Sequence, residues 1–127
     1  MSDTRRTVLV VEDDRDINQL VGEYVEEAGF RYLSAADGRS VFEKARAGQP
    51  SLILLDLMLP DLNGFEVCRR LKEESSTRDI PVVFLTALDQ KKFRDRAREC
   101  GAADYLLKPF APAILIDTIH RHAMPPA

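Results

Sequence analysis

The chain has 127 residues, a length typical of a single domain and sufficient for one continuous hydrophobic core. Its 18 lysines and arginines against 21 aspartates and glutamates give a net charge of −3, so it lacks the basic excess of a protein that binds nucleic acid directly. No apolar run is long enough to cross a membrane, and no signal-peptide pattern is present. We therefore expect one cytoplasmic domain that has neither nucleic acid nor a membrane as a direct partner.

The first half of the chain alternates between short apolar segments and helical patterns. Strands are predicted over three such segments, residues 7–11, 31–35 and 51–55. The second of these alternates as a strand at a sheet edge does. Apolar residues at helical spacing predict a helix over residues 17–28 that stops at Gly29, and a shorter helix around Val41 that ends near Gly48. The segment 57–63 reads as a loop.

The second half repeats this alternation. Two more strands are predicted over residues 82–85 and 104–107. A helix through residues 65–71 comes before them, and a polar helix around Phe93 lies between them and stops at Gly101. Pro112 suits the first turn of a final helix, which is expected to end before Pro125.

Regular alternation of strands and helices, with fully apolar central strands, predicts a parallel sheet covered by helices on both faces. Right-handed crossovers limit the topologies, and five strands of this size fit the flavodoxin-like (βα)5 order 2-1-3-4-5. The predicted fold class is therefore α/β, a doubly wound parallel sheet. Ligands of such sheets bind beyond the carboxyl ends of the strands, at the switch point between the first and third strands.

Polar side chains follow four of the predicted strands at their carboxyl ends. They are Glu12, Asp13 and Asp14 after the first strand, Asp56 after the third, Thr86 after the fourth and Lys108 after the fifth. Because these strand ends share one edge of a parallel sheet, we expect the side chains to meet in one shallow crevice. Carboxylates so close together repel one another, so a proton or a cation must lie among them, and an open site with oxygen ligands suits Mg²⁺.

Each of these residues has a simpler explanation when taken alone. Asp13 and Asp14 could cap the following helix, and we assign that role to Asp14. Lys108 could form a plain salt bridge, and Thr86 could be structural. Capping does not explain Glu12 or Asp56, because a carboxylate at the end of a buried apolar strand is costly without a partner. The acidic first loop has no glycine, which disfavours a nucleotide or flavin phosphate site.

The chemistry that fits this set of residues is phosphoryl transfer to a carboxylate. A carboxylate that attacks phosphorus forms an acyl phosphate. Mg²⁺ and the ammonium of Lys108 would neutralise the phosphoryl oxygens, Thr86 can donate its hydroxyl to one of them, and Asp56 would attack in line. Because an acyl phosphate is hydrolysable, the product would be a transient signal.

Four motifs resemble the response regulator receiver family, along nearly the whole chain from Thr7 to His122. They are Val-Val-Glu-Asp-Asp at 10–14, Leu-Leu-Asp-Leu-Met-Leu-Pro-Asp-Leu-Asn-Gly at 54–64, Phe-Leu-Thr-Ala at 84–87 and Gly-Ala-Ala-Asp-Tyr-Leu-Leu-Lys-Pro-Phe at 101–110. Each motif is weak alone, and the four in order are a strong signal. The resemblance implies a receiver domain over residues 1–124 with a core at about 7–122, and a tail or the start of a linker at residues 125–127.

The resemblance also implies the ligands of a magnesium site. Asp13 matches a direct ligand, and Glu12 matches an acid that acts through water. Asp56 and the backbone carbonyl of Met58 match the remaining protein ligands. Mg²⁺ is the one cofactor expected.

Further roles follow from the same resemblance. Asp56 matches the phosphorylated aspartate, and Thr86 and Lys108 match the pair that binds the phosphoryl group. Tyr105 matches an aromatic switch residue that acts together with Thr86, although a half-buried strand tyrosine would show the same pattern. The peptide bond between Lys108 and Pro109 matches a cis bond of the family.

In this family a sensor histidine kinase or a His-phosphotransfer protein supplies the phosphoryl group. Phosphorylation remodels the surface of the fourth helix, fifth strand and fifth helix, which acts on an output domain or a target protein. Such a chain is not an enzyme, since it catalyses only its own phosphorylation and dephosphorylation. Met58 and Leu88 occupy positions that tune dephosphorylation, and because both are apolar we expect a long-lived phosphoryl form.

A homodimer through the same surface is a partner that the resemblance allows. Winged-helix transcription regulators of the family pair charges across it, and Asp104 and the basic fourth helix fit that pattern. Ile114 and Thr118 stand where the pattern has an acid and a base, so a fully charged dimer is not expected. The apolar run at 113–119 is explained equally well by burial and by a partner surface.

Two other classes of protein compete with a phosphorylated receiver. A pseudo-receiver that only binds partners would not need every site residue, yet all are present. A hydrolase of the haloacid-dehalogenase type would need a second aspartate two residues after Asp56, where Met58 stands.

The cysteines and histidines show no catalytic or metal-binding spacing. Cys68 and Cys100 stand outside any Cys-x-x-Cys or Cys/His cluster, so we predict two reduced, mostly packed thiols. His120 and His122 lie late on the final predicted helix and are expected to be surface residues.

Overall fold

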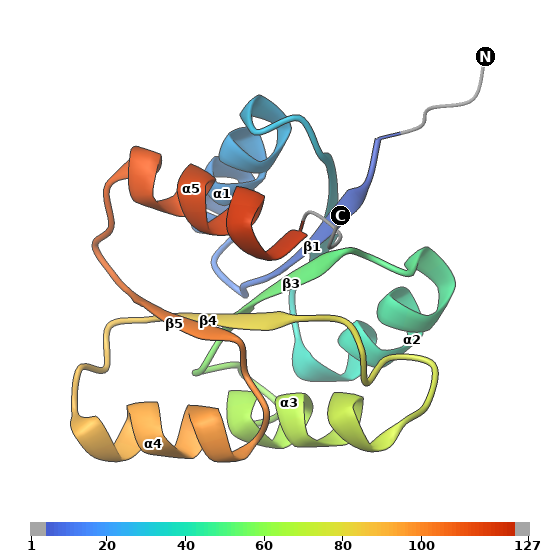
Figure 1. Cartoon of the computed structure of the whole chain (residues 1–127), viewed down its shortest axis with the longest axis vertical. Helices are drawn as coiled ribbons and strands as arrows, with labels where there is room; N and C mark the ends of the chain where they lie inside the picture. The colour runs from blue at the N-terminus through green and yellow to red at the C-terminus, as the bar shows by residue number, and fades with distance from the viewer. Residues whose placement is uncertain (1–4, 124–127) are drawn as a thin grey trace.

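Five parallel strands form one sheet in the order β2-β1-β3-β4-β5, which confirms the predicted topology (Figure 1). The computed structural model describes residues 5–123, so the ends of the predicted domain and its tail lie outside the described residues. The strands are β1 (Thr7–Val11), β2 (Arg31–Ala35), β3 (Leu52–Asp56), β4 (Val82–Thr86) and β5 (Asp104–Leu107). The two strands at the edges, β2 and β5, are the least buried of the five.

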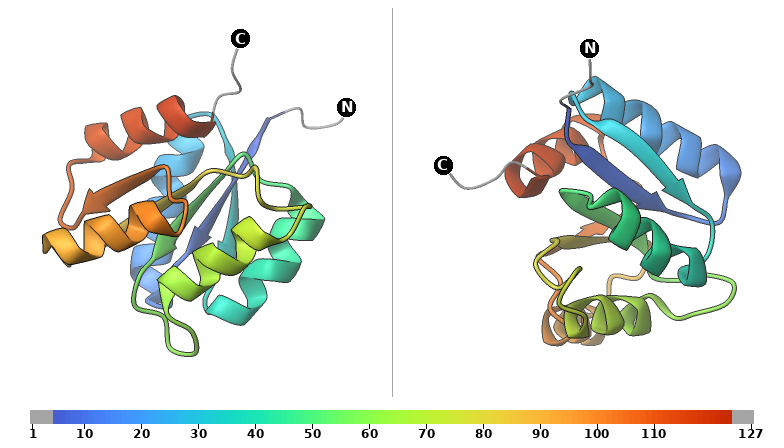
Figure 2. Two further views of the ribbon diagram at one scale, coloured as in Figure 1. Left: turned by 60° about the horizontal axis from the view of Figure 1, so that its bottom comes forward. Right: turned by 90° about the vertical axis from the view of Figure 1, so that its right-hand side faces the viewer.

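Helices cover both faces of this sheet (Figures 1 and 2). On one face lie α1 (Arg15–Glu27) and α5 (Pro112–Ala123). On the other lie α2 (Gly38–Gly48), α3 (Gly64–Glu73) and α4 (Lys91–Glu99). The final helix begins at Pro112, as predicted from the tolerance of proline in a first turn. No helix within residues 5–123 has the length and apolar character needed to span a membrane.

Alternate residues of the central strands face opposite layers of the core. In β1, Leu9 and Val11 belong to the cluster beneath α2, α3 and α4, whereas Val8 and Val10 belong to the cluster beneath α1 and α5. All four are at most 1% exposed. A strand that is buried on both faces needs apolar residues at every position, which is why β1, β3 and β4 read as continuous apolar runs.

Local signals that the sequence predicted are present at several helix ends. The Asp14 carboxylate accepts hydrogen bonds from the N–H groups of Asp16 (3.0 Å) and Ile17 (3.1 Å), which confirms Asp14 as the cap of α1. After α1 and α4 the chain turns at Gly29 (φ 98°) and Gly101 (φ 94°). Both glycines adopt the left-handed conformation that commonly ends a helix.

Some boundaries differ from the prediction by one or two residues, and the largest differences are the start of α1 at Arg15 and the end of α3 at Glu73. The third strand is 52–56 instead of 51–55, and the fourth ends at Thr86, because parallel pairing with the neighbouring strands extends through these polar residues. Within the predicted loop at 57–63, Met58 and Asn63 form an isolated bridge. The Lys108–Pro109 peptide bond is cis, as the family resemblance implied.

The apolar run of α5 is partly buried against the sheet and partly exposed to solvent. Leu115 and Ile119 are fully buried against the sheet, whereas Ile114 is 52% exposed. Thr118 is also buried, and its hydroxyl donates to the Ile114 carbonyl at 2.8 Å. The helix therefore has a buried stripe with one apolar side chain left facing solvent.

Candidate functional site

Three carboxylates meet where the strand order reverses. Glu12 and Asp13 follow β1, Asp56 ends β3, and these two strands are neighbours in the sheet. Each of the three residues has an oxygen within 4.8 Å of the others. We call Glu12, Asp13 and Asp56 the acidic cluster. Asp13 is exposed, while the side chains of Glu12 and Asp56 are only 7% and 13% exposed. The predicted convergence of these acids is present.

A buried amide holds the loop that carries the first two acids. The side chain of Asn18 donates to the carbonyl oxygens of Glu12 (2.9 Å) and Ala35 (3.2 Å), and it accepts a hydrogen bond from the Tyr32 hydroxyl. Asn18 is 4% exposed. The sequence analysis did not single out this residue, although a polar side chain on the buried stripe of a predicted helix was the available signal.

A close backbone approach fixes the loop on the other side of Asp56. The N–H of Met58 donates to Asp56 Oδ1 at 3.2 Å, and the N–H of Gly64 donates to the Leu57 carbonyl at 2.8 Å. A Cβ atom at Gly64 would lie 2.8 Å from both the Asp56 carbonyl oxygen and Leu57 Cα. Only glycine fits this approach, so Gly64 is a positioning residue that the motif contained and the sequence reasoning left unassigned.

Lys108 reaches the acidic cluster from the end of β5. Its Nζ lies 2.7 Å from Glu12 Oε1 and 3.6 Å from Asp56 Oδ2, so the ammonium is held mainly by Glu12. Three carboxylates beside one ammonium leave a formal excess of two negative charges. Such a set of hard oxygen donors with surplus negative charge fits a divalent cation, and in particular Mg²⁺. A pocket of about 500 Å³ opens beside Glu12 and Asp13.

Thr86 and Tyr105 meet at the loop between β4 and α4. The Thr86 side chain is 2% exposed, and its hydroxyl oxygen accepts a hydrogen bond from the Leu88 N–H at 3.2 Å. The Tyr105 hydroxyl donates to the Leu88 carbonyl at 2.6 Å. Burial raises the pKa of Tyr105, against the opposing effects of the Arg94 charge and of a hydrogen bond with Thr86. Thr86 at the end of β4 and the half-buried Tyr105 on β5 are thus connected through Leu88.

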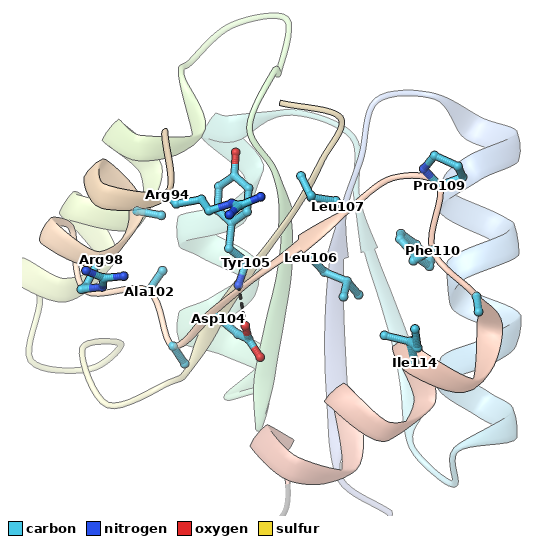
Figure 3. A pocket seen from close by; sticks show the side chains of 13 residues that line it. Arg94, Arg98, Ala102, Asp104, Tyr105, Leu106, Leu107, Pro109, Phe110 and Ile114 are labelled. Carbon is cyan, nitrogen blue, oxygen red and sulfur yellow. Dashed lines mark hydrogen bonds between the residues drawn. The ribbon is translucent and has the colours of Figure 1, made fainter. Parts of the chain in front are cut away.

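The outer surface of α4, β5 and α5 contains a groove of about 590 Å³ (Figure 3). Arg94 and Arg98 lie on its α4 side, Tyr105 on β5 and Ile114 on α5. The basic residues of α4 are exposed to solvent, and Lys91 forms an ion pair with Asp95 at 2.7 Å.

Asp104, which the sequence offered for charge pairing across a dimer, is paired within its own chain. Its Oδ2 lies 3.0 Å from His122 Nε2 and 3.6 Å from Arg121. His122 is therefore only 20% exposed, which corrects its prediction as a surface residue. His120 is exposed, as predicted. Charges that are satisfied within one chain have less to gain from a second copy.

The fold and this arrangement define the class of protein: a flavodoxin-like α/β domain with an acidic cluster, a threonine and a lysine along the carboxyl edge of its sheet. A model of the response regulator receiver domain family matches residues 8–120. The chain belongs to this family, in which phosphorylation and Mg²⁺ binding are typical.

Individual relatives agree with this assignment. The phosphate regulon transcriptional regulatory protein PhoB of Escherichia coli is 45% identical over 114 residues, covering 90% of this chain and 50% of that protein. The chain thus spans about half the length of the curated relatives it matches. The chemotaxis protein CheY4 of Vibrio cholerae has a similar structure, with a TM-score of 0.88, 30% identity and coverage of 94% of this chain and 99% of that one.

A second similar structure contains the ion that the acidic cluster suits. It is the receiver domain of the sensor histidine kinase PA1611 from Pseudomonas aeruginosa, with a TM-score of 0.86 and 28% identity, covering 94% of this chain and 98% of that one. That structure has a magnesium ion coordinated in its active site cleft.

Proposed function

We propose that this chain is a phosphoacceptor, in which Asp56 takes a phosphoryl group from a sensor histidine kinase or a His-phosphotransfer protein. The observation that carries the proposal is the meeting of Glu12, Asp13 and Asp56 with Lys108 at the switch point of the sheet. If these residues served only as structural salt bridges, we would expect about one cationic side chain for each acid, yet one ammonium faces three carboxylates.

The transfer is a displacement at phosphorus. A carboxylate oxygen of Asp56 forms the new bond to phosphorus, and the bond between phosphorus and the donor's imidazole nitrogen breaks. The leaving nitrogen keeps the electron pair and takes up a proton. The N–H of Met58 holds Asp56 Oδ1, which orients the carboxylate before the donor arrives.

Lys108 and Thr86 are the residues that would bind the phosphoryl oxygens. Lys108 lies closer to Glu12 than to Asp56, so its ammonium has to move from one acid to the incoming group. The Thr86 hydroxyl would turn its proton toward a phosphoryl oxygen. Leu88 is hydrogen-bonded to both Thr86 and Tyr105. A rotation of the Thr86 side chain would therefore change the position of Tyr105 on the surface formed by α4, β5 and α5.

The acidic cluster would hold Mg²⁺ through Asp13, Asp56 and the Met58 carbonyl, with Glu12 acting through water. When bound, Mg²⁺ neutralises charge on the phosphoryl oxygens. Without a cation the cluster repels an anionic donor, because its formal charge is negative even with Lys108 in place. Phosphorylation is therefore expected to depend on Mg²⁺.

The groove of α4, β5 and α5 would be the surface that binds an output domain or a target protein in the cytoplasm. PhoB is a transcriptional regulatory protein, and this chain matches half of it, which supports an output domain as one partner. A homodimer through the same surface would rest on the exposed Ile114 more than on Asp104, because Asp104 is already paired.

The test is incubation with acetyl phosphate and Mg²⁺, followed by measurement of the intact mass. We expect the mass of one phosphate group to be added to the chain, and expect Asp56→Asn or chelation of the metal to abolish it. The matched control is Asp117→Asn, which changes an exposed aspartate on α5 and should be phosphorylated like the parent chain.

Three results would contradict the proposal. No added mass on the parent chain would favour a pseudo-receiver that only binds partners. Added mass that persists in Asp56→Asn would place the phosphoryl group elsewhere. Steady turnover of phosphate esters would favour a hydrolase.

A long-lived phosphoryl form is proposed on the same basis. Met58 is 67% exposed beside Asp56, and its thioether cannot orient an attacking water as a carboxamide or carboxylate could. Decay of the added phosphate, followed with labelled phosphate, should take much longer than seconds. Met58→Asn should shorten it, while Leu20→Asn, which changes another exposed apolar residue on α1, should not.

A further inference from the structure

The two cysteines of the chain meet between α3 and α4, although they are 32 positions apart in the sequence. Cys68 lies in the middle of α3, and Cys100 is the cap residue at the end of α4. The Cys68 thiol donates to the Cys100 carbonyl oxygen at 3.4 Å, and the Cys100 thiol donates to the Ala97 carbonyl at 3.2 Å. Both are free thiols. The two cysteines are far apart in the sequence, and the fold brings them into contact.

Their surroundings differ in a way that matters for reactivity. Cys68 is fully buried, whereas Cys100 is half-buried and lines a groove of about 220 Å³ between α3 and α4. The same groove is lined by two arginines, Arg69 and Arg96, and by two glutamates, Glu66 and Glu99, so its lining carries no net formal charge. A small oxidant in solvent can therefore reach Cys100 and not Cys68.

The interaction between the two side chains also separates the acidities of the thiols. It raises the pKa of Cys68, as burial does, and it lowers the pKa of Cys100 with help from backbone N–H groups and the charge of Arg96. The thiolate is the nucleophilic form of cysteine, and a lowered pKa, partial exposure and nearby arginines are features of reactive cysteines.

We propose that Cys68 and Cys100 form an oxidisable pair, which closes an intrachain disulfide between α3 and α4 when the chain meets a hydroperoxide. Cys100 is the residue attacked first, and Cys68 is the resolving residue. The inference does not depend on phosphorylation of Asp56.

The reaction is balanced with hydrogen peroxide as the oxidant. The Cys100 thiolate attacks one peroxide oxygen, the O–O bond breaks, and the leaving hydroxide takes a proton to become water, which leaves a sulfenic acid on Cys100. The Cys68 sulfur then attacks the Cys100 sulfur, the S–O bond breaks, and the second oxygen leaves as water. Two thiols and one peroxide give one disulfide and two waters.

The bond would tie the end of α4 to the middle of α3. At its other end α4 follows the loop of Leu88, which connects Thr86 with Tyr105. The bond would thus restrain the helix next to the connection from the site to the surface. Amide hydrogen exchange within α4 should become slower in the oxidised chain than in the reduced chain.

The experiment treats the whole reduced chain with hydrogen peroxide. We expect the intact mass to fall by two hydrogens, both thiols to become inaccessible to an alkylating reagent after denaturation, and a peptide pair joined between Cys68 and Cys100 to appear after proteolysis. Cys68→Ser should stop at a Cys100 sulfenic acid that dimedone traps, and Cys100→Ser should remain reduced at Cys68.

The serine variants keep a donor at each position, and circular dichroism verifies their folding. The parent chain needs no substitution, so its result is decisive whether or not the variants fold. Two thiols that stay open to alkylation, a disulfide found only between two chains, or oxidation of Cys100 to a sulfinic acid without a disulfide would each overturn the proposal.

Discussion

The Tyr105 hydroxyl donates a 2.6 Å hydrogen bond to the carbonyl oxygen of Leu88. On its other side, the N–H of Leu88 donates to the hydroxyl oxygen of Thr86 at 3.2 Å. The Tyr105 ring packs against Phe84, one strand inward, with ring centroids 6.3 Å apart. A movement of Thr86 therefore has a short bonded path to Tyr105, and each link of that path can be removed by one substitution.

Tyr105→Phe removes the hydroxyl and keeps the ring. The Leu88 carbonyl then loses a partner in a half-buried loop, so we expect the free energy of unfolding to fall by about 0.5–1.5 kcal/mol. Phosphorylation of Asp56 should persist, because the hydroxyl does not contact the acidic cluster. Urea denaturation and the chemical shift of the Leu88 amide provide the measurements.

The control for this substitution is Tyr24→Phe. Tyr24 is also half-buried, and within residues 5–123 its hydroxyl makes no hydrogen bond. It should leave both stability and the Leu88 amide nearly unchanged. Equal effects of the two substitutions would show that the bond to Leu88 contributes nothing.

Lys108→Ala should change metal binding and phosphorylation in opposite directions. Removal of the ammonium, 2.7 Å from Glu12, raises the formal negative excess of the site from two to three. Mg²⁺ should therefore bind roughly tenfold more tightly, as measured by titration calorimetry. Phosphate incorporation from acetyl phosphate should fall by about a hundredfold or more, because a positive partner of the phosphoryl group is lost.

Asp13→Asn is the control variant for the Mg²⁺ titration, and the change in affinity is expected to have the opposite sign. It removes one negative oxygen donor, so Mg²⁺ should bind more weakly than to the parent chain. Weaker binding in Lys108→Ala as well would mean that Lys108 supports the metal site instead of competing with it.

Gly64→Ala should damage both stability and the site. The added Cβ would lie 2.8 Å from the Asp56 carbonyl oxygen and from Leu57 Cα, and this contact can be relieved only if the loop moves. We expect a loss of about 1–3 kcal/mol in the free energy of unfolding, measured with urea. Phosphorylation should also slow, because the Asp56 carboxylate moves with its backbone.

Gly29→Ala separates these two effects. Gly29 has a positive φ of 98° with no atom within 4 Å of the added Cβ, so its cost is conformational and roughly 1 kcal/mol. Its phosphorylation should match that of the parent chain. If Gly64→Ala also lost only stability, Gly64 would not be a positioning residue for Asp56.

Asp61 should give the fold an acid-sensitive contribution. Hydrogen bonds from the Gly38 N–H (2.7 Å) and then from the Arg39 N–H (3.0 Å), at the start of α2, hold its pKa below the usual 3.8. A carboxyl group whose pKa is lower in the folded state stabilises that state fully above its unfolded pKa. The contribution is lost as the pH falls through the folded pKa.

The corresponding variant is Asp61→Asn. At neutral pH it should be less stable than the parent chain, and the difference should shrink below about pH 4. Urea midpoints measured across this range test the expectation. A difference that stays constant into acid would mean that the charge of Asp61 plays no part.

Much of the fold could be predicted because its signals are local. Apolar runs identified the buried strands, and Asp14, Gly29, Gly101 and Pro112 identified helix ends through their own backbone preferences. The strand ends were harder to place. Asp56 and Thr86 belong to their strands because neighbouring strands pair with them, and pairing partners are distant in sequence.

The site shows the same division. The sequence alone predicted that the acids, Thr86 and Lys108 lie close together, since the carboxyl ends of parallel strands must share one edge. Asn18 and Gly64 could not be assigned roles, because their importance comes from atoms that approach them only in the folded chain. Likewise, His122 is covered by its contact with Asp104, which no periodicity of α5 reveals.

The sequence by itself determined the class of fold, the residues of the acidic cluster and the family to which the chain belongs, because these depend on periodicity and on short motifs. Only the tertiary structure decided that Lys108 rests on Glu12, that Leu88 connects Thr86 with Tyr105, and that Cys68 meets Cys100. Each of these contacts joins different parts of the chain, and their geometry is set by how strands pair and helices pack.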